Sequence, residues 1–268
     1  MTNRHNSTGD DILTESNATI EARLLVNALK PKYPLDIAWL SSQVLGKPVI
    51  IDERDFPINV CAMILDKPVY TSVHICVNSN RPLTSRRFAV AHELAHIYLG
   101  HQGDISIIEE EEDPFLHTEA DNFATEILAP KNRMLALAQK YREPMDLIHY
   151  ILRGYKVSLE MACRRLVELE VYKGAFMCFS ESQPLFAYNT PGVNLNIEKI
   201  NSIPVIKRGC LICQKETIDG VPARCYIRRF KSGNFLIAWI EEKPETLYKL
   251  LSHHRMKTQK ISAANQND

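Results

Sequence analysis

The stretch FAVAHELAHIYL, residues 88–99, decides how the middle of the chain folds. Apart from its two histidines and one glutamate it is apolar on nearly every side, which is typical of a helix buried in a core. Thr84 or Ser85 can cap such a helix at its start. Gly100 follows the last apolar residue, so we expect the helix to end there.

The histidines of this helix, His92 and His96, are four residues apart and therefore lie one turn apart on one face. Two imidazoles in that arrangement can bind one metal ion. Glu93 is rotated about 100° further around the helix, where a carboxylate can take a proton from a water on the metal. The spacing predicts a zinc peptidase site with Glu93 as the base. The five-residue pattern also arises by chance, and a buried helix with incidental histidines is the alternative.

An open zinc site needs a third protein ligand. The three-histidine extension of the motif requires glycine at position 99 and histidine at position 102, but the sequence has Leu99 and Gln102. The next expected helix, residues 115–128, carries Glu119 on its polar edge. Glu119 is therefore the predicted third ligand, and Glu126 is the alternative.

Other polar residues near the motif can assist the reaction. His101 lies past Gly100, where a structural role is favoured and a second-shell or substrate role is the alternative. An oxyanion requires a donor besides the metal, and Tyr98, His101 and His117 are candidates. The predicted oxyanion and second-shell set is Tyr98, His101, His117, Asn122 and Glu126.

The rest of the chain alternates helical and β-rich segments. Helices are expected from residue 20 to Pro31, over 35–45 with Gly46 as C-cap, and over 134–170 with breaks near Pro144 and Gly154. Strands are expected at 49–51, 60–64 and 73–77, as a small sheet, and again at 175–179, 223–230 and 235–240. This pattern predicts an α+β protein.

Bulk properties exclude several classes of protein. The 268 residues carry 32 basic and 32 acidic side chains, so the overall charge does not favour nucleic acid or a membrane surface as a partner. The polar N-terminus lacks the apolar core of a secretory signal, and no apolar run approaches about 20 residues. We therefore expect a cytoplasmic protein whose seven cysteines are reduced. Cys210 and Cys213 are expected to be ordinary thiols, with a second metal or a redox role as alternatives.

Three motifs in order carry a likeness to a known family. They are the helix segment 87–101, the sequence E-A-x-x-F-A at 119–124, and L-x-P at 128–130. Over residues 20–135 the chain resembles the ImmA/IrrE family of metallopeptidases. The resemblance implies a thermolysin-like (gluzincin-type) zinc core with His92, His96 and Glu119 as metal ligands and Glu93 as general base. The metal it implies is Zn²⁺, with Mn²⁺ as the alternative.

The resemblance also implies a substrate and a domain organisation. Members of the family cleave helix-turn-helix repressors, which predicts an XRE-type repressor as protein substrate. The alternative is a non-proteolytic module that sequesters a transcriptional regulator, or a regulatory subunit. Residues 145–170, with Arg164 and Arg165, resemble a helix-turn-helix segment, but neutral charge disfavours nucleic-acid binding there. The predicted domains are a disordered tail (1–18), a peptidase domain (19–135), a helical segment (136–172), a C-terminal α/β module with a GAF-like likeness (173–250) and a second tail (251–268).

Overall fold

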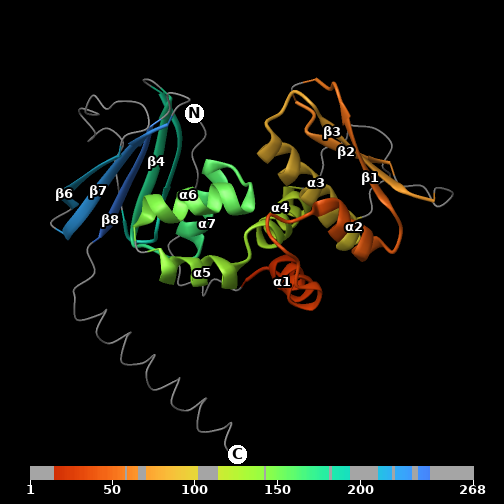
Figure 1. Cartoon of the computed structure of the whole chain (residues 1–268), viewed down its shortest axis with the longest axis horizontal. Coiled ribbons are helices and arrows are strands. Elements are labelled where there is room, and N and C mark those ends of the chain that lie inside the picture. Colours follow the sequence, from red (N-terminus) through yellow and green to blue (C-terminus); the bar gives the residue numbers. More distant parts are fainter. Residues whose placement is uncertain are drawn as a thin grey trace, which may run out of the picture. The chain divides into compact units, whose positions relative to one another are not determined.

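The protein is described here from a computed structural model, which covers residues 15–57, 59–65, 71–101, 114–141, 143–180, 183–193, 211–218, 221–230 and 235–241. The chain divides into two compact units, residues 1–165 and 166–268, which are described one at a time. The described residues form seven helices and two sheets (Figure 1), so the expected α+β class is confirmed. The thermolysin-like core, the GAF-like likeness and the five domain boundaries stay predictions.

The expected tails fall mostly on residues that are not described. Residues 1–14 and 251–268 lie outside the described part of the chain, and helix α1 begins at Asn17. None of the helices in the described ranges is long and apolar enough to cross a membrane.

Helix α1 (Asn17–Leu29) starts at a capping serine. The backbone N–H of Thr19 donates to Ser16 Oγ over 3.2 Å, which satisfies one of the free donors at the helix start. Its buried residues recur every fourth position and form one stripe: Ala18, Ala22 and Val26. This helix packs beside α4 (Pro114–Leu128), as Figure 1 shows, because its small residues allow a close approach.

Helix α2 (Ile37–Leu45) has a capping residue at each end. Asp36 Oδ1 accepts from the N–H of Trp39 over 3.0 Å, and Gly46 ends the helix in the left-handed conformation with φ 64°. The predicted C-cap at Gly46 is confirmed. The helix contacts strand β1 (Val49–Arg54) and helix α3 (Leu83–Tyr98).

The first sheet has the order β1-β3-β2, with β2 at Ala62–Leu65 and β3 at Val73–Asn78. Strand β3 runs parallel to β1 and antiparallel to β2. As the central strand it is buried along nearly its whole length. The small three-stranded sheet expected from the sequence is therefore present, directly before the helix that carries the histidines.

Helix α3 begins without a side-chain cap. Its N-cap is Pro82, so the expected cap at Thr84 or Ser85 is wrong: both residues lie inside the first turn. The buried residues lie on more than one side of the helix, as predicted for a buried helix: Ala89, Val90, Ala91, Leu94 and Ala95. They pack α3 against β2, β3 and α4.

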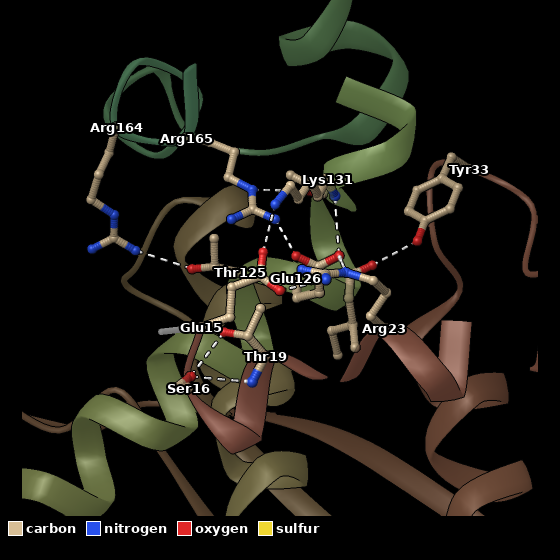
Figure 2. A network of polar contacts seen from close by, with 12 residues as sticks. Glu15, Ser16, Thr19, Arg23, Tyr33, Thr125, Glu126, Lys131, Arg164 and Arg165 are labelled. Atoms are coloured by element: carbon tan, nitrogen blue, oxygen red, sulfur yellow. Dashed lines mark hydrogen bonds and ion pairs between the residues drawn. The ribbon is translucent and has the colours of Figure 1, made fainter. Parts of the chain in front are cut away.

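A buried carboxylate, Glu126, ties α4 to α1, to the start of α5 and to Arg165 within the first unit (Figure 2). The Glu126 side chain is fully buried, and it pairs with Arg23 of α1 at 3.3 Å and with Arg165. It also accepts from the backbone N–H of Lys131, at the start of α5 (Lys131–Lys140), over 3.1 Å. Arg164 donates to Thr125 over 3.1 Å.

The predicted helical segment, residues 136–172, contains the end of α5 and the whole of α6 (Pro144–Tyr155) and α7 (Leu159–Glu168). The boundary between the two units falls within α7. Arg164 and Arg165 of this helix are engaged by α4, so they are not aligned along a free surface as phosphate-binding arginines would be.

The second unit contains a five-stranded antiparallel sheet in the order β5-β4-β8-β7-β6. The strands are β4 (Gly174–Ser180), β5 (Gln183–Asn189), β6 (Leu211–Ile218), β7 (Val221–Arg229) and β8 (Phe235–Glu241). One face carries a buried cluster made of Met177, Phe179, Cys225, Ile227 and Ile237. Strands β5 and β6, at the two edges, were not predicted. Cys213 is exposed on β6, and Cys210 lies outside the described residues.

Candidate metal centre

Helix α3 brings the two motif histidines together, as the sequence predicts. His92 and His96 follow one another on one face, and their Nε2 atoms are 3.0 Å apart. Both rings are partly buried. Two imidazole nitrogens held this close on one helix can bind the same metal ion.

A third histidine comes from helix α4. The Nδ1 atom of His117 lies 3.0 Å from Nε2 of His92, and its ring lies 5.2 Å from the ring of His96. One nitrogen of each of the three rings lies within 4.8 Å of one nitrogen of each of the others. Among the described residues, this is the group of histidine, cysteine, aspartate and glutamate side chains that could hold a metal ion.

The donor set of this group fits zinc. Zn²⁺ takes imidazole nitrogens at about 2.0–2.1 Å in a tetrahedral arrangement, which places two ligand nitrogens about 3.4 Å apart. The separations of 3.0 Å between the ring nitrogens of His92 and those of His96 and His117 lie close to that value. A catalytic zinc site keeps three protein ligands and leaves one position for water or substrate.

Burial keeps the central ring in the form that binds metals. Burial first, and then the neighbouring histidine rings, lower the pKa of His96 from 6.5 to about 4. At neutral pH this imidazole is therefore uncharged, and a neutral imidazole can offer a lone pair to a metal.

The other nitrogen of His92 faces a carboxylate. Asp121, one turn after His117 on α4, places Oδ1 2.8 Å from His92 Nδ1. A histidine that binds metal through one nitrogen usually donates the N–H of its other nitrogen to such a partner, which fixes the tautomer and the ring orientation. Sequence reasoning missed Asp121, although its i, i+4 relation to His117 was a visible signal.

The predicted ligand Glu119 lies beside a different histidine. Its Oε2 atom is 3.3 Å from Nε2 of His101, and Nδ1 of His101 is 3.1 Å from Nδ1 of His96. Glu119 is thus connected to the motif through His101, and it is not part of the three-histidine group.

The remaining predicted residues occupy varied places. Glu93 is half-buried on α3, directly after His92. Tyr98 packs on Phe123 of α4 with ring centroids 5.1 Å apart, and burial raises the pKa of its hydroxyl. Asn122 is half-buried on α4. Glu126 is enclosed by the arginines of Figure 2 and does not belong to the histidine group.

Part of the chain is similar to a known protein family. Residues 55–167 match the model of a peptidase family described as the IrrE N-terminal-like domain. The matched segment is less than half of the chain. The likeness to the ImmA/IrrE family that the sequence motifs indicated is confirmed. The matched segment, residues 55–167, contains both helices of the histidine group and the first sheet from its second strand onward.

Solved structures share the fold at low sequence identity. A Mycobacterium tuberculosis transcriptional regulator is similar with a TM-score of 0.55 and 14% identity, over 84% of this chain and 87% of that chain. At this identity the likeness concerns the fold alone. No curated protein sequence matches the chain.

Proposed function

We propose that the protein is an intracellular zinc-dependent endopeptidase with a narrow range of protein substrates. The observation that carries this proposal is the convergence of imidazole nitrogens from α3 and α4, with a glutamate placed one residue after the first histidine. The peptidase description of the matching family supports it. Cytoplasmic localisation belongs to the same proposal.

The metal would be held by His92, His96 and a third ligand from α4. Zinc, when bound, acts as a Lewis acid on a carbonyl and makes water acidic enough to react near neutral pH. Two residues of α4 are candidates for the third ligand: Glu119 by family resemblance, and His117 by the histidine group. Mn²⁺ stays the alternative metal.

Glu93 is proposed to act as the general base. Its carboxylate accepts a proton from the attacking water and later passes that proton to the leaving amine. The neighbouring position on α3 gives it a fixed place relative to His92, because both side chains project from one rigid turn. Tyr98, His101 and His117 stay the candidates for an oxyanion donor.

The proposed substrate is an XRE-type helix-turn-helix repressor, whose cleavage would relieve repression. The family resemblance supports a regulatory protein as substrate, and the similar solved structure is itself described as a transcriptional regulator. The inward-facing Arg164 and Arg165 make residues 145–170 a poor phosphate-binding surface, which is consistent with a protein partner.

The test uses the full chain, loaded with one equivalent of zinc, and a purified XRE-type repressor encoded beside its gene. Mass spectrometry should find two repressor fragments that sum to the intact mass plus one water. A chelator should stop the cleavage, and Glu93→Gln should lower its rate by about 100-fold or more while metal stays bound. Cleavage by Glu93→Gln at the normal rate would exclude the proposed base. A repressor that is bound but left intact would instead favour the sequestering module.

A further inference from the structure

We propose that Ser72, His74 and Asp52 form an acyl-acceptor site on the first sheet, at which Ser72 takes the acyl group of an activated ester. The three side chains are connected in the order that prepares a serine hydroxyl for nucleophilic attack, from hydroxyl to imidazole to carboxylate. The site shares no residue with the histidine group of α3 and α4. It therefore goes beyond the proposed function and does not depend on it.

The register of the first sheet brings the three residues together. His74 lies on the central strand β3, and its side chain is on the face opposite to that of Val73, which is completely buried. Asp52 of the parallel strand β1 pairs with Cys76, two residues after His74, and so shares the face of His74. Ser72 directly precedes β3 and contacts the same imidazole ring.

The two contacts of His74 fix the role of each ring nitrogen. Nδ1 lies 3.0 Å from Oδ2 of Asp52, and Nε2 lies 3.2 Å from Oγ of Ser72. A carboxylate only accepts hydrogen bonds, so the proton of the neutral ring is on Nδ1. The lone pair on Nε2 then accepts the hydroxyl hydrogen of Ser72. In this arrangement a histidine acts as general base toward a serine, and a carboxylate holds its tautomer.

The site is open to a reagent in solution. The side chains of His74 and Asp52 are 35% and 32% exposed, and Ser72 is half-buried. A histidine and an aspartate on neighbouring strands also stabilise a sheet as a cross-strand pair. Such a pair does not require a hydroxyl on the second ring nitrogen, so the contact to Ser72 is the observation that points to chemistry.

The backbone beside Ser72 limits the class of ester. In α/β-hydrolases the N–H of the residue after the nucleophile stabilises the oxyanion. The N–H of Val73 instead donates to the carbonyl of Pro48 over 2.9 Å. Because one oxyanion donor is worth about 10²–10³ in rate, Ser72 is poorly equipped for peptide bonds. Acyl donors whose leaving group departs easily, such as aryl esters, are the substrates that it suits.

The proposed step transfers one acyl group and one proton. Oγ of Ser72 attacks the carbonyl carbon, and the new Oγ–C bond forms as the bond from that carbon to the aryl oxygen breaks. Nε2 of His74 takes the hydroxyl proton and then releases it to the departing phenolate or to water. Asp52 stabilises the imidazolium in between. The products are O-acylated Ser72 and a phenol.

An apolar neighbour favours a hydrocarbon acyl chain. Ile50 of β1 is the register partner of His74, and its side chain is 41% exposed. A methylene chain that lies on Ile50 leaves water, which is favourable, whereas a charged acyl group gains nothing there. We therefore expect the site to prefer a butyryl group over an acetyl group.

The test treats the full chain with p-nitrophenyl acetate and maps the acetylated residues by mass spectrometry. Ser79, an exposed serine just after β3, is the reference within the same molecule. Ser72 should be acetylated at least about 100-fold faster than Ser79, because a positioned general base contributes about 10²–10⁴-fold. In His74→Ala the two serines should react at similar rates. Asp52→Asn should slow Ser72 at least about tenfold, since its amide can hold the wrong tautomer.

Two further variants complete the test. Ser79→Ala is the matched control and should leave the rate at Ser72 unchanged. Ile50→Ser should lower the ratio of butyrylation to acetylation at Ser72 at least about threefold, and an unchanged ratio would overturn the assignment of the acyl chain. Each variant should unfold in urea with the cooperative transition of the parent protein, so that a slow reaction reports chemistry and not misfolding.

The outcomes separate this site from the proposed peptidase. Acetylation of Ser72 should persist in a chelator and in Glu93→Gln, which removes the proposed base of the metal centre. Equal rates at Ser72 and Ser79 in the parent protein, or an acetyl group found on His74 and not on Ser72, would overturn the proposal and leave the peptidase untouched. A protein that acylates Ser72 but cleaves no repressor would contradict the proposed function alone.

Discussion

Nδ1 of His101 lies 3.1 Å from Nδ1 of His96 because the end of helix α3 folds back on itself. The N–H of His101 donates to the carbonyl of His96 over 2.9 Å, and the N–H of Gly100 donates to the carbonyl of Ile97 over 3.2 Å. These two bonds, with Gly100 at φ 70°, form a Schellman motif. The turn that ends α3 thus places the ring of His101 beside His96 of the motif.

Gly100→Ala tests this arrangement. An alanine at positive φ costs about 1–2 kcal/mol, although a Cβ here would meet no atom within 4 Å. We expect lower stability and also weaker zinc binding, because relaxation of the turn moves His101 away from His96. Gly46→Ala is the control, since Gly46 also has positive φ, 64°, and open space around it, but ends α2. Equal zinc affinities in the two variants would contradict the role of the turn.

Metal removal should lower stability by a calculable amount. A ligand that binds only the folded state adds RT ln(1 + [L]/Kd), or about 2.7 kcal/mol when free zinc is 100 times Kd. Denaturant unfolding with zinc and with a chelator should show this difference in the parent protein. His92→Ala should show almost none of it. A parent protein whose unfolding midpoint is the same in both conditions would be evidence against a metal centre.

The network around Glu126 in Figure 2 predicts a loss of folding stability that does not depend on metal. Glu126 is fully buried, and Glu126→Ala would leave Arg165, whose side chain is 8% exposed, without its carboxylate partner. Breaking one partner of a buried pair costs about 3–5 kcal/mol. Glu53→Ala, which removes a 60% exposed partner of Arg86, should cost at most about 1 kcal/mol. Urea titrations of both variants check the contrast, and a similar small cost for each would show that water or other groups replace Glu126.

The sequence was sufficient for much of the centre because helix spacing is a local property. The i, i+4 pair His92 and His96, the closing Gly100 and the stripe of the next helix follow from residues a few positions apart. The side on which α4 meets α3 is a tertiary property, so the spacing could not rank His117 against Glu119. His117 and Asp121, also an i, i+4 pair, were the signal for the face of α4 that meets His92.

The same limit, that local sequence does not show tertiary contacts, explains why only part of the second sheet was predicted. The central strands β4 and β8 are rich in apolar and aromatic residues and were predicted, because burial on both faces leaves a continuous apolar run. Strand β5 lies at an edge, and its residues are mostly exposed. Its pairing with β4 supplies the stabilising hydrogen bonds. The amino-acid composition of the strand does not indicate that pairing.

The last prediction concerns Asp121, whose carboxylate contacts Nδ1 of His92. Asp121→Ala removes the acceptor 2.8 Å from His92 Nδ1, so the ring is free to turn and to exchange its tautomer. We expect zinc affinity to fall about 10–100-fold. Stability without metal should change by no more than about 0.5 kcal/mol, because the Asp121 side chain is 43% exposed.

Asp121→Asn separates orientation from charge. The amide oxygen of asparagine can accept the same proton, so this variant should keep most of the zinc affinity if orientation of the ring is what matters. If instead the negative charge of Asp121 strengthens the ligand, Asp121→Asn should bind zinc as weakly as Asp121→Ala. Thr118→Ala, an exposed change on the same helix, should leave zinc binding unaltered and serves as the control. Zinc affinity of Asp121→Ala equal to that of the parent would show that His92 is held by its packing on α3 and not by this carboxylate.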